Sequence, residues 1–363
     1  MRAPMTPRER WLAAIRCQPV DRLPFWPKLD QPYPLRQKEP FSRMSVSELH
    51  AWIGSDPHVG APWCLRSIRK TTSVERTQKD GIARTTYRTP RGELVMVERH
   101  DPLTNSWHPR EHPVKTADDI ETMMLVYADE QVEFDPDGYE KAAQFVRDTG
   151  ETALAVSGIG ISPLMEWLQY VAGIENGLLL LADYPERVEA LFAQAHRVML
   201  RRAELLVEKG PYEVIYSLEN TSTTIISPDL FRRYSLPHLQ EYSRIIAGGG
   251  KQHVLHMCGK LKALLPDIDT LPAAALEAFT SPPVGNTTLA DGRSAMPQKC
   301  FIGGTNATLW LEPANAIIRT IERDLAALPH RRGIVVTSGG VMPPACAPET
   351  IRRVGQWVMS QAA

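Results

Sequence analysis

The chain has 363 residues, of which 43% are hydrophobic and 23% are charged, a composition typical of globular proteins that bury a large core. Its 41 lysines and arginines nearly balance 42 aspartates and glutamates, so the net charge of −1 offers no electrostatic footprint for nucleic acid or an anionic membrane. No apolar run near the middle approaches the roughly 20 residues of a membrane span, and the first residues lack a signal-peptide pattern. We therefore expect a cytoplasmic protein that binds neither nucleic acid nor membrane.

Five cysteines are scattered along the chain: Cys17, Cys64, Cys258, Cys300 and Cys346. Their odd number and wide spacing, in a compartment expected to be reducing, argue against a disulfide framework. A cysteine with a special role is therefore expected to be a metal ligand or a nucleophile.

The first 150 residues contain fewer regular elements than the rest of the chain. Apolar segments at Arg22–Trp26 and near Val59–Leu65 predict two strands. The segment Thr85–His100, centred on Pro90-Arg91-Gly92, predicts a β-hairpin.

From about residue 150, short apolar runs alternate with longer helical patterns, which is typical of βα units and a parallel sheet. The strands are predicted at Thr152–Ser157, Glu213–Leu218, Gln252–Cys258, Ala273–Ala278, Cys300–Gly303 and Gly333–Ser338. A helix with an apolar stripe begins near Asp183, where Asp183 and Glu186 fit a capping box, and another runs from Ser227-Pro228 to Gly248–Gly250. With eight strands available, we expect an α/β fold, a single (β/α)8 TIM barrel over residues 1–363 with an N-terminal elaboration.

The most informative motif lies at the end of the predicted strand Gln252–Cys258. His256 and Cys258 are two residues apart, so their side chains share one face at the end of the strand where such barrels build active sites. Imidazole and thiolate are ligands that suit Zn²⁺, and three protein ligands would leave one position open for catalysis. The loop after the last strand contains Cys346, a candidate third ligand. The competing interpretation is a hydrogen-bonded core histidine beside a small buried cysteine.

Two carboxylates follow the same geometric rule. Glu219 lies just past the strand before the His-Cys strand, and Glu277 ends the strand after it, so both are candidate catalytic residues at the pocket. Glu219 could complete a metal shell or transfer a proton, or it could only cap a loop. His253 is out of phase with His256 and is expected to point toward the helices.

Several segments in a specific order resemble the uroporphyrinogen decarboxylase superfamily, on its corrinoid-dependent methyltransferase side. They include Thr6–Arg10 with Pro19–Pro24, Tyr87–Gly92 with Glu111–Asp119, Ala182–Glu186, Ile226–Pro228, His256–Gly259, and Glu277–Pro283 followed by Gly285. The resemblance implies a (β/α)8 barrel. In relatives similar to methylcobalamin:coenzyme M methyltransferase, it also implies a zinc ion held by a His-x-Cys pair and a distant cysteine. His256 and Cys258 match the first two positions.

The chain departs from the superfamily in two places. The distant cysteine usually stands in a Gly-Cys-x-x-Pro pattern, but here that segment reads Gly339-Gly340-Val341-Met342-Pro343, so Cys346 is either a relocated ligand or only a loop cysteine. The decarboxylase carries an arginine-rich signature that binds propionates, whereas Phe25–Tyr33 contains one cation, Lys28. Decarboxylation of a tetrapyrrole is therefore a poor match.

Our leading hypothesis is a zinc-dependent methyltransferase with the metal on His256, Cys258 and Cys346. It would move a methyl group between a small methylated substrate or a thiol and a corrinoid, which the resemblance places on a separate partner protein. The alternative is a decarboxylase or lyase that acts without metal on a smaller carboxylic acid and uses Glu219. A non-enzymatic binding or scaffolding barrel is a third hypothesis, which the intact His256-Cys258 pair disfavours.

Overall fold

The computed structural model describes residues 4–102 and 105–362. Eight parallel strands form a nearly closed barrel, which confirms the predicted (β/α)8 fold. In chain order they are β1 (Phe25–Trp26), β2 (His58–Gly60), β9 (Leu154–Gly160), β10 (Val214–Leu218), β11 (Gln252–His256), β12 (Ala275–Phe279), β13 (Cys300–Gly304) and β14 (Ile334–Thr337). The sheet order is β1-β14-β13-β12-β11-β10-β9-β2, so β1 and β2 are its two ends.

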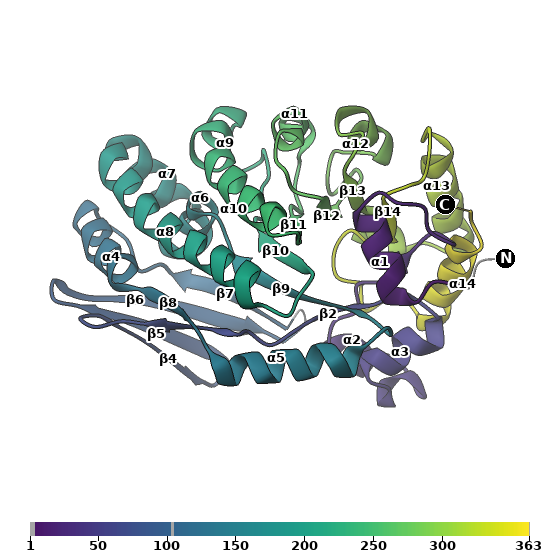
Figure 1. The fold of residues 1–363 in the computed structure, drawn as a ribbon, viewed down its shortest axis with the longest axis horizontal. Coiled ribbons are helices and arrows are strands. Elements are labelled where there is room, and N and C mark those ends of the chain that lie inside the picture. The colour runs from purple at the N-terminus through teal and green to yellow at the C-terminus, as the bar shows by residue number, and fades with distance from the viewer. Residues whose placement is uncertain (1–3, 103–104, 363) are drawn as a thin grey trace.

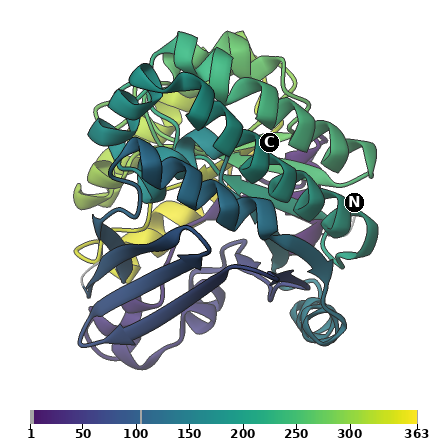
Figure 2. The ribbon, with the colours of Figure 1, turned by 90° about the vertical axis from the view of Figure 1, so that its left-hand side faces the viewer.

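The segment between β2 and β9 is the N-terminal elaboration, and it contains two antiparallel sheets. One pairs β3 (Leu65–Ile68) with β8 (Gln131–Phe134), and the other has four strands, β4 (Ser73–Lys79), β5 (Ile82–Thr89), β6 (Gly92–Asp101) and β7 (Ser106–Glu111). The predicted hairpin is the β5–β6 pair. Figure 2 shows this four-stranded sheet below the helices of the barrel.

Helices cover the outside of the barrel, and α7 to α12 follow one another along its upper side in Figure 1. The helices before β9 are α1 (Pro7–Ile15), α2 (Pro32–Leu35), α3 (Val46–Ile53), α4 (Ala117–Asp129) and α5 (Pro136–Thr149). Those that follow are α6 (Pro163–Glu166), α7 (Ile174–Asp183), α8 (Pro185–Lys209), α9 (Pro228–Tyr234), α10 (Leu236–Gly248), α11 (Leu265–Asp269), α12 (Leu289–Ala295), α13 (Ala314–Ala326) and α14 (Pro348–Met359). Within the described ranges, no helix combines the length and apolar character needed to cross a bilayer.

Two local predictions were wrong. The Asp183–Glu186 capping box is absent, because Asp183 ends α7 and α8 begins at Pro185 without a side-chain cap. The helix opened by Ser227 is split at Ser235 into α9 and α10, since Pro237 in the first turn of α10 has no amide hydrogen to continue the α9 ladder. Ser227 itself caps α9 as expected, and its hydroxyl accepts from the Leu230 amide at 3.2 Å.

Side chains alternate between the inside of the barrel and the layer under the helices. Every second strand residue, such as Val214 and Tyr216 on β10 and Val254 on β11, joins an interior cluster that includes Trp11 and Leu12 of α1. This alternation also places His256 two residues beyond Val254 and on the same inner face.

Candidate metal and catalytic site

The candidate site lies at the C-terminal ends of the strands, where three segments far apart in sequence meet. His256 is the last residue of β11, Glu277 lies opposite it on β12, and Lys28 follows β1 by two residues. The Nδ1 atom of His256 pairs with Oε2 of Glu277, and Nζ of Lys28 donates to Oε1 of the same carboxylate at 2.9 Å. One carboxylate therefore holds both cationic groups.

Burial strengthens the electrostatic interactions among Lys28, Glu277 and His256. Glu277 is 3% exposed, and burial opposes its ionisation, but the charges of Lys28 and His256 outweigh that effect and hold the pKa of Glu277 well below its usual value. Burial likewise opposes protonation of His256, and the Glu277 carboxylate overcomes it and raises the His256 pKa. The imidazole orientation is fixed through Nδ1, so Nε2 is the nitrogen left for a ligand or metal.

Cys258 lies just past the end of β11 and is exposed. Its thiol donates to Oδ1 of Asn220 at 3.4 Å, and it also hydrogen bonds the His256 side chain. Asn220 is held in turn by Gln169, whose Oε1 accepts from Nδ2 of Asn220 at 2.8 Å. The structure thus brings His256 and Cys258 together, with the sulfur on the accessible side.

Glu219 follows β10 and is completely buried. Its Oε1 accepts from the Ser162 amide at 3.0 Å, while Oε2 is buried without a hydrogen-bond partner. Burial raises the pKa of Glu219 to about 7, with a further contribution from Glu166, although the Ser162 contacts favour the ionised form. The carboxyl group can therefore change its protonation near neutral pH, as a general acid or base requires.

Cys346 lies in the loop after β14 and is 2% exposed. Its carbonyl accepts from the Tyr33 hydroxyl, and its sulfur lies 3.9 Å from the Ala347 carbonyl oxygen. Burial raises the pKa of this thiol to about 12. Across residues 4–102 and 105–362, no three His, Cys, Asp or Glu side chains are grouped to hold a metal ion, so Cys346 does not join the other two in this conformation.

The sequence gives Lys28 no role beyond that of a single cation in Phe25–Tyr33, yet the structure places it in the site. The available signal was its position, since it lies just beyond a barrel strand at the same end as His256. His253 behaves as predicted: its ring points outward and bonds the hydroxyls of Ser217 and Ser243, each at 2.8 Å.

Comparisons with known proteins agree with this architecture. A solved structure described as a methyltransferase from Methanosarcina mazei superposes with a TM-score of 0.60 at 17% identity and covers 98% of each chain, which shows a shared fold. A B12-independent methionine synthase from Shewanella sp. W3-18-1 gives only 0.39 at 13% identity, over 67% of this chain and 72% of that one. No curated protein matches the sequence. The uroporphyrinogen decarboxylase (URO-D) family profile matches residues 108–360, and the chain therefore belongs to this family.

Proposed function

We propose that the chain is a methyltransferase that moves a methyl group between a small methylated substrate or thiol and a corrinoid carried by a partner protein. The observation that carries the proposal is the His256-Cys258 pair at the C-terminal end of β11, with the imidazole held by Glu277. Membership of the URO-D family and the fold shared with the Methanosarcina mazei methyltransferase support it.

The pair fits two positions of a zinc site. Glu277 on Nδ1 leaves Nε2 of His256 for the metal, in the carboxylate–histidine arrangement common around zinc, and Cys258 supplies an accessible sulfur two residues away. We propose Cys346 as the third ligand, which requires the loop after β14 to turn its sulfur out of the core. Zinc bound there would stabilise a thiolate at neutral pH or polarise a methylated heteroatom.

The protein's own residues prepare this site before any substrate arrives. Glu277 orients the imidazole, and Lys28 neutralises the buried carboxylate from the other side, so a single rotamer of His256 is favoured. Oδ1 of Asn220 accepts a hydrogen bond from the Cys258 thiol, which helps to hold the sulfur beside the His256 side chain. Lys28 and Glu277 are therefore positioning residues, whereas His256 and Cys258 would contact the reacting groups.

The test measures zinc content and corrinoid chemistry on the same samples. Metal-free protein is incubated with zinc, and we expect about one ion per chain in the wild type and a loss of tight binding in His256→Ala and Cys258→Ala. Cys17→Ala is the matched control, because it removes a thiol near Gln298, at the opposite end of the barrel. The cobalt absorption spectrum of free or protein-bound corrinoid should change with a methyl donor in the wild type and the control only. Full activity of Cys258→Ala would overturn the proposal.

A second candidate function rests on Glu219. A buried carboxyl with a pKa near 7 and one unpartnered oxygen could serve as the general acid or base of a decarboxylase or lyase acting on a small carboxylic acid. If this alternative holds, the activity persists after metal chelation and does not require corrinoid. It is lost in Glu219→Gln and retained in Cys258→Ala. A parallel assay of these two variants distinguishes the candidates.

A further inference from the structure

The barrel has a seam between β1 and β2, the two ends of its strand order. Within the described ranges, no strand ladder joins them, and two bonds between Phe25 and Asp56 take its place. The Phe25 amide donates to Oδ2 of Asp56 at 3.1 Å, and the Asp56 amide donates to the Phe25 carbonyl at 2.8 Å. Beyond Asp56, the seam is bridged by the rings of Trp26 and His58, whose centroids are 3.9 Å apart.

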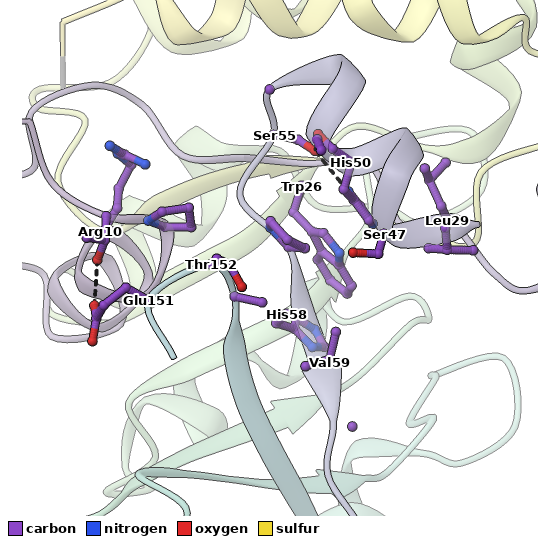
Figure 3. A pocket seen from close by; sticks show the side chains of 18 of the residues that line it. Arg10, Trp26, Leu29, Ser47, His50, Ser55, His58, Val59, Glu151 and Thr152 are labelled. Atoms are coloured by element: carbon purple, nitrogen blue, oxygen red, sulfur yellow. Dashed lines mark hydrogen bonds between the residues drawn. The ribbon is translucent and has the colours of Figure 1, made fainter. Parts of the chain in front are cut away.

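A cavity of about 950 Å³ opens at this seam, beside α1, α3 and the end of α5. We call it the seam cavity; Figure 3 shows Trp26 and His58 among the side chains that line it, together with Ser47 and His50 of α3. Its volume is in the range of pockets that bind small molecules. Most of its wall is apolar, including Leu29, Ala51, Val59 and Phe145.

His58 is the polar group of the seam cavity that lacks a partner. Both of its ring nitrogens are buried and neither has a hydrogen-bond partner, which is an unfavourable state for an imidazole. Trp26 covers one side of the His58 ring, and the centroid of the Trp11 ring lies 5.3 Å from the centroid of the His58 ring. A half-turn about the Cβ–Cγ bond exchanges each nitrogen with a ring carbon, so a nitrogen can be presented to a ligand without disturbing this packing.

The charges around the cavity are already neutralised. Arg10 and Arg22 both bind the buried Asp56, and Glu151 accepts from Thr6 and Arg8. Burial also lowers the pKa of His58 to about 3, so its ring is neutral at physiological pH and offers one donor and one acceptor. Among the described residues that line the cavity, none offers a free counter-ion to a charged ligand, whereas a neutral hydroxyl could pair with either nitrogen.

We propose that the seam cavity binds a small neutral molecule that carries an apolar group and a hydroxyl group, with the hydroxyl paired to His58 and the apolar group against the apolar wall. The described residues that line the seam cavity do not include Lys28, Glu277, His256 or Cys258, and the proposal does not depend on methyl transfer. It needs no metal and no corrinoid.

The test compares two probes of nearly the same shape, 4-fluorophenol and 4-fluorotoluene, and follows their binding to the 363-residue chain by ¹⁹F NMR. We expect saturable binding of 4-fluorophenol, about 5-fold tighter than 4-fluorotoluene, because only the phenol can make the additional hydrogen bond. His58→Phe keeps an aromatic ring against Trp26 and should make the two affinities equal. Gly60→Phe should weaken both probes, since a Cβ at Gly60 meets no atom within 4 Å and a large side chain can enter the cavity.

A direct measurement removes any dependence on the folding of the variants. The ¹⁵N shifts of the His58 ring in the wild type should move as 4-fluorophenol is added and stay unchanged with 4-fluorotoluene. Absence of saturable binding, equal affinities for the two probes in the wild type, or unmoved His58 nitrogens would each overturn the proposal.

Discussion

Glu219 provides a stability test whose size and sign follow from its burial. Its pKa is 4.5 in an unfolded chain and about 7 in the folded protein, so below pH 4.5 both states hold the proton. Between pH 4.5 and 7 the unfolded state ionises while the folded state keeps its proton, and the contribution of Glu219 to stability falls as the pH rises. At ~1.4 kcal/mol for each pH unit, the loss is about 3 kcal/mol by pH 8.

Glu219→Gln isolates this effect, because glutamine resembles the protonated acid but does not ionise. We expect the wild type minus Glu219→Gln difference in unfolding free energy to fall by about 3 kcal/mol between pH 4.5 and 8. Urea unfolding followed by tryptophan fluorescence at four pH values measures it, and all other titrating groups cancel in the difference. Glu208→Gln is the control for removing a carboxylate from the surface, since the Glu208 side chain is 62% exposed. A Glu219→Gln difference that varies by less than about 0.5 kcal/mol would refute the reasoning.

Three other predictions concern the metal and substrate sites. Cys346→Ser should weaken zinc binding roughly 10-fold if Cys346 is the third ligand, and unchanged affinity by chelator competition would reassign that position. Gly340→Cys restores the relatives' pattern at a position where a Cβ meets no atom within 4 Å, so it should tighten zinc binding; unaltered affinity would show that the loop does not face the metal. Uroporphyrinogen should not be converted, because Lys28 is the only cation of Phe25–Tyr33 and is already bound to Glu277; product formation by chromatography would contradict this.

Much of the barrel could be predicted from the sequence because burial acts locally. The strand Gln252–His256 is a short run buried on both faces, and α8 shows its buried face as a period of 3.6 residues. Both patterns can be recognised without knowledge of the partner element. The position of this strand in the sequence also predicted that His256 lies at its C-terminal end. Capping and helix breaks were less predictable, as at Asp183 and Pro237, where the neighbouring proline decided the outcome.

The site chemistry was decided only by the tertiary structure. Lys28 and Glu277 are 249 positions apart, and barrel closure brings them together by placing β1 next to β14. Whether a carboxyl is ionised depends on which charges and how much water surround it, so Glu277 and Glu219 have opposite pKa shifts although both lie near strand ends. The sequence determined which residues reach this end of the barrel, and long-range packing determined their partners, because burial and charge are set by neighbours from distant parts of the chain.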